Sequence, residues 1–129
     1  MLYLVVLYND TSEAIQFRNM ENSNDNQTVQ PYSMFRTQVR FDIPDCSAEK
    51  YFAGHHMEIT DSQGEVLFSF WGDDHKNYDL YYCPKMDYSS RAKMPGGAEQ
   101  GGNHRNVGIV LSGNSDNRTI LGRPVQNNV

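Results

Sequence analysis

The sequence predicts an all-β fold, a single-domain antiparallel β-sandwich that spans residues 1–129. Short segments with apolar side chains at alternate positions recur along the chain, separated by turns rich in Gly, Asn and Asp. No segment sustains the period of an amphipathic helix. No internal repeat is visible either, which disfavours propellers and trefoils. We count about eight such strands, a number typical of a sandwich or a barrel.

The first predicted strand is the continuous apolar run at residues 2–8, LYLVVLY, whose composition indicates burial on both faces. After the turn NDTSE, Ile15 and Phe17 alternate with polar residues and predict a second strand. Residues 19–33 are rich in Asn, Ser, Asp and Gln and predict a loop. Residues 34–43 show the clearest alternation, and Pro44 ends it. The expected inward side chains of this strand are Phe35, Val39, Phe41 and Ile43.

The middle of the chain predicts a β-hairpin. The segments HMEIT and EVLFSFW flank the turn DSQG, and the apolar residues of both segments alternate. Residues 78–83, YDLYYC, predict the next strand. The segment SAEKYFAG at residues 47–54 leaves open one short helical turn or none.

The last third contains one long segment without a regular pattern, residues 84–106, which includes the glycine-rich PGGAEQGG. Val107, Ile109 and Leu111 then predict a late strand. The turn GNSDN follows, and RTILG at residues 118–122 predicts the final strand.

Composition narrows the classes of partner. The formal net charge of −5 disfavours non-specific binding to nucleic acid and to anionic lipid, but leaves a neutral or zwitterionic head group open. The apolar start lacks the charged region and the cleavage site of a signal peptide, so we expect a cytoplasmic protein, with release by a non-classical route left open. Cys46 and Cys83 allow at most one disulfide, and we expect both thiols to be reduced.

Motif analysis predicts neither an enzyme nor a cofactor. The segment Asp73-Asp74-His75 matches no zinc spacing and lacks the twelve-residue calcium loop with its terminal Glu. PGGAEQGG lacks the Gly-Lys-Ser/Thr ending of a phosphate-binding loop. There is no GxSxG segment, and no thiol-protease sequence surrounds either cysteine. We therefore predict no catalytic residue and no metal site.

The predicted ligand-binding site is the aromatic cluster around the polar loop that follows the hairpin. Such rings either lie at a membrane interface or stack on sugars, while neighbouring carboxylates and imidazoles bond hydroxyl groups. For each ring the alternative is ordinary core packing. The predicted site residues are Trp71, Asp73, His75, Tyr78 and Tyr81.

Four segments resemble the aegerolysins, a family of small acidic β-sandwich proteins. YLVVLYNDTSEAIQFRNM is similar to their first hairpin, and IPDCSA to their single-cysteine segment. MEITDSQGEVLFSFWGDDHKN is similar to their central hairpin, and VGIVLSGNSDNRTILG to their closing one. Together these segments cover about half of the chain. The related actinoporin-like sandwich of cytolysins and fungal lectins resembles VLFSFW and the neighbouring tyrosines almost as closely.

The resemblance implies a lipid-binding function or a glycan-binding one, and a structural role is a third hypothesis that does not depend on it. An aegerolysin recognises a sphingolipid head group in ordered membranes, and pore formation needs a separate pore-forming partner protein. In that case Trp71, Asp73, His75 and Tyr78 would lie in or near the lipid-facing loop, and Trp71→Ala should weaken binding without loss of folded structure. A lectin of similar fold would bind a glycan there. A structural or self-assembling protein would form a homo-oligomer, for which the face of Arg36, Arg40 and Asp42 is a candidate.

Overall fold

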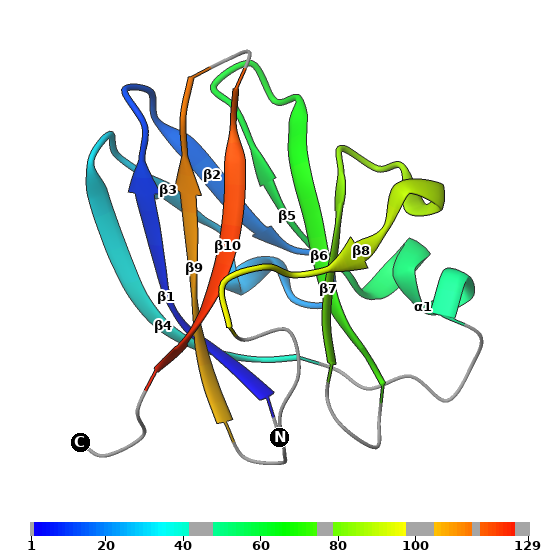
Figure 1. The fold of residues 1–129 in the computed structure, drawn as a ribbon. Helices are drawn as coiled ribbons and strands as arrows, with labels where there is room; N and C mark the ends of the chain where they lie inside the picture. The colour runs from blue at the N-terminus through cyan, green and yellow to red at the C-terminus, as the bar shows by residue number, and fades with distance from the viewer. Residues whose placement is uncertain (1, 42–47, 75–78, 98–104, 115–116, 126–129) are drawn as a thin grey trace.

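The computed structural model describes residues 2–41, 48–74, 79–97, 105–114 and 117–125. Within them the chain forms two β-sheets packed face to face, which confirms the predicted all-β sandwich (Figure 1). These residues hold ten strands, one short α-helix and two 3-10 turns, more elements than the eight strands expected.

The four-stranded sheet contains the two ends of the described chain. Its strand order is β10-β9-β1-β4, and the strands are β1 (Leu2–Asp10), β4 (Ser33–Arg40), β9 (Arg105–Ser112) and β10 (Thr119–Val125). β1 is antiparallel to β4 but parallel to β9. This parallel pair is an exception to the antiparallel sandwich that we predicted. It joins strands from the two ends of the chain, which sequence patterns do not relate.

The six-stranded sheet is antiparallel at every pair, in the order β3-β2-β5-β6-β7-β8. Its strands are β2 (Ile15–Asn19), β3 (Gln27–Val29), β5 (Met57–Thr60), β6 (Val66–Asp74), β7 (Asp79–Pro84) and β8 (Ala92–Lys93). The predicted central hairpin is confirmed, because Met57 pairs with Phe70 and Ile59 with Phe68. The Asp61 carboxylate accepts the amide hydrogens of Gln63 and Glu65 and so fixes the turn.

The short elements are where the structure differs most from the prediction. The Asn-rich region expected to be a loop contains the 3-10 turn η1 (Ser23–Asp25) and the strand β3. The region from residue 84 onward contains a second 3-10 turn, η2 (Tyr88–Ser90), and the strand β8. The segment for which one helical turn or none was expected forms the helix α1 (Ala48–His55).

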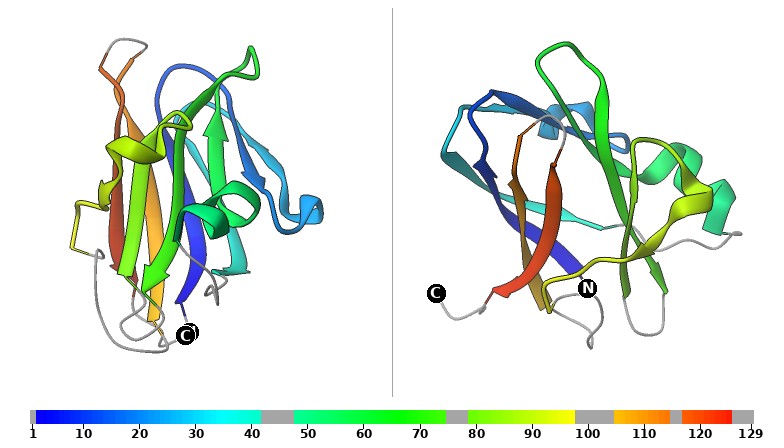
Figure 2. Two further views of the ribbon diagram at one scale, coloured as in Figure 1. Left: turned by 90° about the vertical axis from the view of Figure 1, so that its right-hand side faces the viewer. Right: turned by 45° about the horizontal axis from the view of Figure 1, so that its top comes forward.

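The described residues form two apolar cores. The main core fills the space between the sheets with residues such as Leu4, Leu7, Phe17, Phe70 and Ile109. The second core lies on the outer face of the six-stranded sheet and contains Phe52, Trp71 and Cys83, with Tyr81 and Tyr88 at its margin. α1 and η2 lie against β6 and β7 on this side of the molecule (Figure 2). They shield that face of the sheet from solvent.

A short strap, residues 94–97, connects the two sheets along one side. The Met94 amide donates to the Leu80 carbonyl of β7 (2.9 Å), and the Gly122 amide of β10 donates to the Pro95 carbonyl (2.8 Å). Gly96 has a φ of +111°, and a Cβ atom there would lie 2.5 Å from the Gly122 carbonyl oxygen. The first glycines of the segment predicted to be irregular therefore permit a close backbone contact with β10.

Candidate functional site

The structure places Trp71 in the second core, which corrects its predicted place in a ligand-binding cluster around the loop. β6 continues three residues beyond it to Asp74, and its side chain is only 1% exposed. The indole stacks on Tyr81, its cross-strand partner, at a centroid distance of 6.2 Å, and packs edge-on against Phe52 at 4.9 Å. An indole covered in this way presents no ring face to a ligand. Trp71→Ala is therefore expected to cost stability rather than binding alone.

The rest of the predicted site is only partly described. Tyr81 is half-buried at the margin of the second core, beside Trp71. His75, Tyr78 and the side chain of Asp73 lie outside the described residues. The structure thus brings Trp71 and Tyr81 together, but as packing partners.

Cys83 is a free and fully buried thiol in the same core. Burial, and to a lesser extent the Asp87 carboxylate, raises the pKa of Cys83 from 9.0 to about 11. The thiol is therefore protonated at neutral pH and unsuited to nucleophilic chemistry. Cys46 lies outside the described residues.

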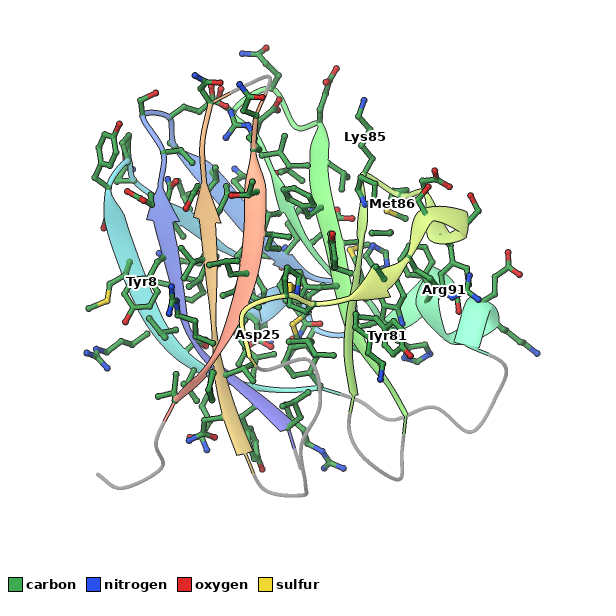
Figure 3. The ribbon with its side chains drawn as sticks, in the orientation of Figure 1. Tyr8, Asp25, Tyr81, Lys85, Met86 and Arg91 are labelled. Atoms are coloured by element: carbon green, nitrogen blue, oxygen red, sulfur yellow. The ribbon has the colours of Figure 1, made fainter. Side chains whose placement is uncertain are left out.

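A more exposed candidate lies on the opposite side of the molecule, on the outer face of the four-stranded sheet. In register across its four strands run Met34, Tyr8, Val110 and Leu121. Tyr8 is 40% exposed and Met34 is 42% exposed, while the other two are half-buried. We call these four residues the apolar row. Tyr8 lies on this sheet, across the molecule from Tyr81 and Arg91 (Figure 3).

A groove of about 730 Å³ opens along one end of the apolar row. Tyr32, in the turn before β4, also borders this groove, beside Tyr8 and Met34. At 70% exposure it is the most exposed large apolar residue in the described part of the chain. Two charged side chains complete the groove. Its main lining residues are Tyr8, Asp10, Tyr32, Met34, Val110 and Arg123.

The turn that carries Tyr32 is held firmly. The Tyr32 amide donates to the Thr11 carbonyl at 3.2 Å. The buried Asn9 side chain donates from Nδ2 to the carbonyls of Val29 and Gln30, at 3.1 and 3.0 Å, and accepts the Thr11 hydroxyl. These bonds tie the β1–β2 turn to the end of β3. Tyr32 itself adopts a φ of +53°, a left-handed conformation that is unfavourable for a tyrosine.

Basic side chains flank the apolar row, although the whole chain is acidic. The next row across the sheet places Arg36 and Arg123 at its two ends, with Val6 and Gly108 between them. Both arginines are exposed. Asp10 is the acidic residue among the described groove residues. This face therefore carries local positive charge in a protein whose formal net charge is −5.

This arrangement is suited to binding a ligand. Exposed rings beside arginines and a carboxylate can hold a ligand that has a cationic group, an anionic group and an apolar part. The groove residues are not among the predicted site residues, because the composition of LYLVVLY indicates burial on both faces. The signal was present in the tyrosine at the end of that run and in the segment Pro-Tyr-Ser-Met, where Tyr32 lies in a turn and Met34 follows it.

We find no match to this chain among protein-family models, curated proteins or solved structures. Over the described residues, no helix is long and apolar enough to cross a membrane. In the same part of the chain, no group of three or more His, Cys, Asp or Glu side chains is placed to hold a metal ion.

Proposed function

We propose that this protein is a non-enzymatic lipid-binding β-sandwich that recognises the zwitterionic head group of a membrane sphingolipid through the outer face of its four-stranded sheet. The observation that carries the proposal is the combination on one face of exposed rings, the apolar row and flanking arginines. The resemblance of the sequence to the aegerolysins supports the same function.

Each part of a phosphocholine-type head group has a suitable partner in the groove. The faces of Tyr8 and Tyr32 attract a quaternary ammonium group, as aromatic rings do in many choline sites. The Arg123 guanidinium donates well to phosphate oxygens. Met34 and the tyrosine rings are side chains that settle at the boundary between head groups and acyl chains.

The test is co-sedimentation with liposomes of phosphatidylcholine and cholesterol, with and without sphingomyelin. We expect the protein to pellet with sphingomyelin vesicles, and Arg123→Gln to weaken pelleting by at least tenfold. Arg91→Gln removes the same charge on the far side of the molecule and serves as the matched control. Equal pelleting of both variants, or none of the wild type, would contradict the proposal.

A glycan-binding function is the second candidate, because Asp10 lies in the same groove as Tyr8 and Tyr32. A carboxylate next to an exposed ring is the arrangement in which a sugar stacks on the ring and donates its hydroxyls to the acid. Asp10→Asn and Tyr32→Phe separate the two functions. Both should weaken binding to a glycan array, since Asp10→Asn removes the charge that strengthens hydrogen bonds from sugar hydroxyls and Tyr32→Phe removes a hydroxyl, while Tyr32→Phe should leave liposome binding intact.

Assembly is a further part of the proposal. Lipid recognition of the aegerolysin kind would require a separate partner protein for pore formation, and the apolar row is also a surface on which two copies could associate. Light scattering of the free protein and of the protein recovered from vesicles would measure the oligomeric state in both conditions.

A further inference from the structure

A second pocket lies at the end of the sandwich where loops from both sheets meet, and we call it the end pocket. Its volume is about 460 Å³, within the range of small-molecule sites. Glu13 comes from the β1–β2 turn and Arg118 from the segment just before β10, whereas Glu65, Val66 and Phe68 come from the β5–β6 hairpin. Lys85, at the end of β7, completes it and extends from the upper end of the molecule in Figure 3.

Arg118 is the unusual residue of this pocket. Its side chain is only 9% exposed, and Nη2 donates to Glu13 Oε1 at 2.8 Å. Nη1 is buried and has no hydrogen-bond acceptor among the described residues. A buried donor without an acceptor lowers the stability of the folded state, and a charged donor lowers it more than a neutral one. Such a group in a native structure therefore needs an explanation. An acceptor supplied by a ligand would satisfy Nη1.

The other charges of the end pocket define what that ligand can be. The Asp61 carboxylate already accepts two backbone amide hydrogens of its own turn, and these bonds stabilise the hairpin. Lys85 adds a second cation, while Glu13 and Glu65 add two carboxylates. A doubly charged phosphate would be repelled by these carboxylates more strongly than a singly charged group. The wall formed by Val66, Phe68 and neighbouring residues is apolar.

From this arrangement we infer that the end pocket binds a small organic monocarboxylate, whose carboxylate accepts from Arg118 Nη1 and whose apolar body packs on the β6 wall. This site is separate from the lipid-binding face proposed above and does not depend on it. A planar guanidinium recognises a carboxylate well because its N–H groups match the two oxygens.

The test is a titration of the ¹⁵N-labelled protein with 3-phenylpropanoate, followed by amide chemical shifts. We expect saturable shifts at residues 65–68 and at Arg118. The neutral isostere 3-phenylpropanamide should bind at least tenfold more weakly, because it lacks the charge that pairs with the guanidinium. Arg118→Gln should weaken binding of 3-phenylpropanoate at least tenfold, whereas Arg91→Gln should leave it unchanged.

Glu13→Gln keeps an oxygen to accept from Nη2 but removes the competing charge, so it should tighten binding several-fold. Loss of stability alone would not produce that gain, and the comparison stays informative even if Arg118→Gln fails to fold. Absence of saturable shifts, equal binding of acid and amide, or shifts confined to the groove of Tyr8 and Tyr32 would each overturn the inference.

Discussion

Tyr32 combines an unfavourable backbone conformation with an exposed aromatic ring. Its left-handed backbone costs a non-glycine residue roughly 1–2 kcal/mol. Its ring, 70% exposed, recovers little of that cost through packing. Strained residues that are held firmly by their surroundings often serve a function. A role in contacting something outside the chain accounts for both observations.

Replacing Tyr32 should therefore separate stability from binding. Asn tolerates the left-handed region, so Tyr32→Asn should leave the free energy of unfolding unchanged or raise it by up to about 1 kcal/mol. The same change should weaken sphingomyelin-dependent pelleting, because the ring is lost. Urea denaturation and liposome co-sedimentation measure the two quantities. A variant that loses stability but still pellets would show that the ring acts only in the fold.

The two glycines Gly96 and Gly54 should respond in opposite directions to alanine. At Gly96 a Cβ atom would meet the Gly122 carbonyl oxygen at 2.5 Å, and the backbone is left-handed. Gly96→Ala should therefore lower the free energy of unfolding by about 2 kcal/mol or more. Gly54 lies in α1 with open space around it, so Gly54→Ala should raise stability by up to about 1 kcal/mol. Thermal or urea denaturation of both variants tests this, and a tolerated Gly96→Ala would argue against the strap.

Cys83 should make the protein less stable at alkaline pH. Its pKa is about 11 in the folded state and near 9.0 when the thiol is exposed. Below pH 9 both states hold the proton, but between pH 9 and 11 the unfolded state loses it first. Unfolding is therefore favoured progressively, by about 2 kcal/mol at pH 11 and by at most about 3 kcal/mol above it. Cys83→Ala should flatten the dependence of unfolding free energy on pH in this range. An unchanged slope would contradict the buried thiol.

At the scale of elements, α1 depends on the second core. A helix of eight residues is too short to be stable alone. The Phe52 ring packs against Trp71, Tyr88 and His56 at centroid distances of 4.9, 5.1 and 4.7 Å. His56 also anchors the end of the helix, because its Nδ1 donates to the Phe52 carbonyl and its Nε2 lies 2.9 Å from Glu58 Oε2.

Truncation of Phe52 should therefore detach α1 and uncover Trp71. Phe52→Ala should cost about 3–5 kcal/mol, the usual range for a buried phenylalanine. Because Trp71 is the single tryptophan of the chain, its fluorescence should shift to longer wavelength in the folded variant. Lys50→Ala, at an exposed position of the same helix, is the control. Unshifted emission would mean that η2 and Tyr81 cover the indole without α1.

The elements that were predicted well are those whose own residues specify the structure, without contacts from distant parts of the chain. The hairpin of β5 and β6 has a turn that selects its own register, and β4 has an uninterrupted alternation. β3 (Gln27–Val29) was not predicted because three residues inside a region rich in Asn, Ser, Asp and Gln are too few to show an alternation, and the strand is held by its pairing with β2. Trp71 was misplaced for a similar reason. Its burial comes from α1 and η2, which approach from separate parts of the chain.

At the scale of the whole molecule, opposite faces of the sandwich have different environments. The outer face of the six-stranded sheet is covered by α1 and η2, so its aromatic residues form a core. On the outer face of the four-stranded sheet no described element covers Tyr8 and Met34, and both side chains are exposed. Sequence patterns alternate similarly on both sheets. Such patterns do not indicate which face a distant segment will cover. For this reason the predicted site lies on the six-stranded sheet, whereas the groove lies on the four-stranded one.

The parallel pairing of β1 with β9 makes the four-stranded sheet depend on distant parts of the chain. A fragment that ends at residue 97 keeps β4 beside β1 but lacks β9 and β10. The inward residues Leu4 and Leu7 would then lose much of their cover. We expect this fragment to lack cooperative thermal unfolding by circular dichroism. Cooperative unfolding of the fragment would show that the six-stranded sheet is stable without its partner.

The same pairing has a consequence for the newly made protein. While the chain is being synthesised, β1 emerges well before β9, so the edge of β1 that pairs with β9 stays unpaired in the meantime. Loop closure over such a distance is slow, and folds built on distant contacts form in milliseconds to seconds. During this interval the apolar run LYLVVLY is accessible to chaperones and to other nascent chains. The yield of folded protein in a cell should therefore depend on how well that first strand is protected.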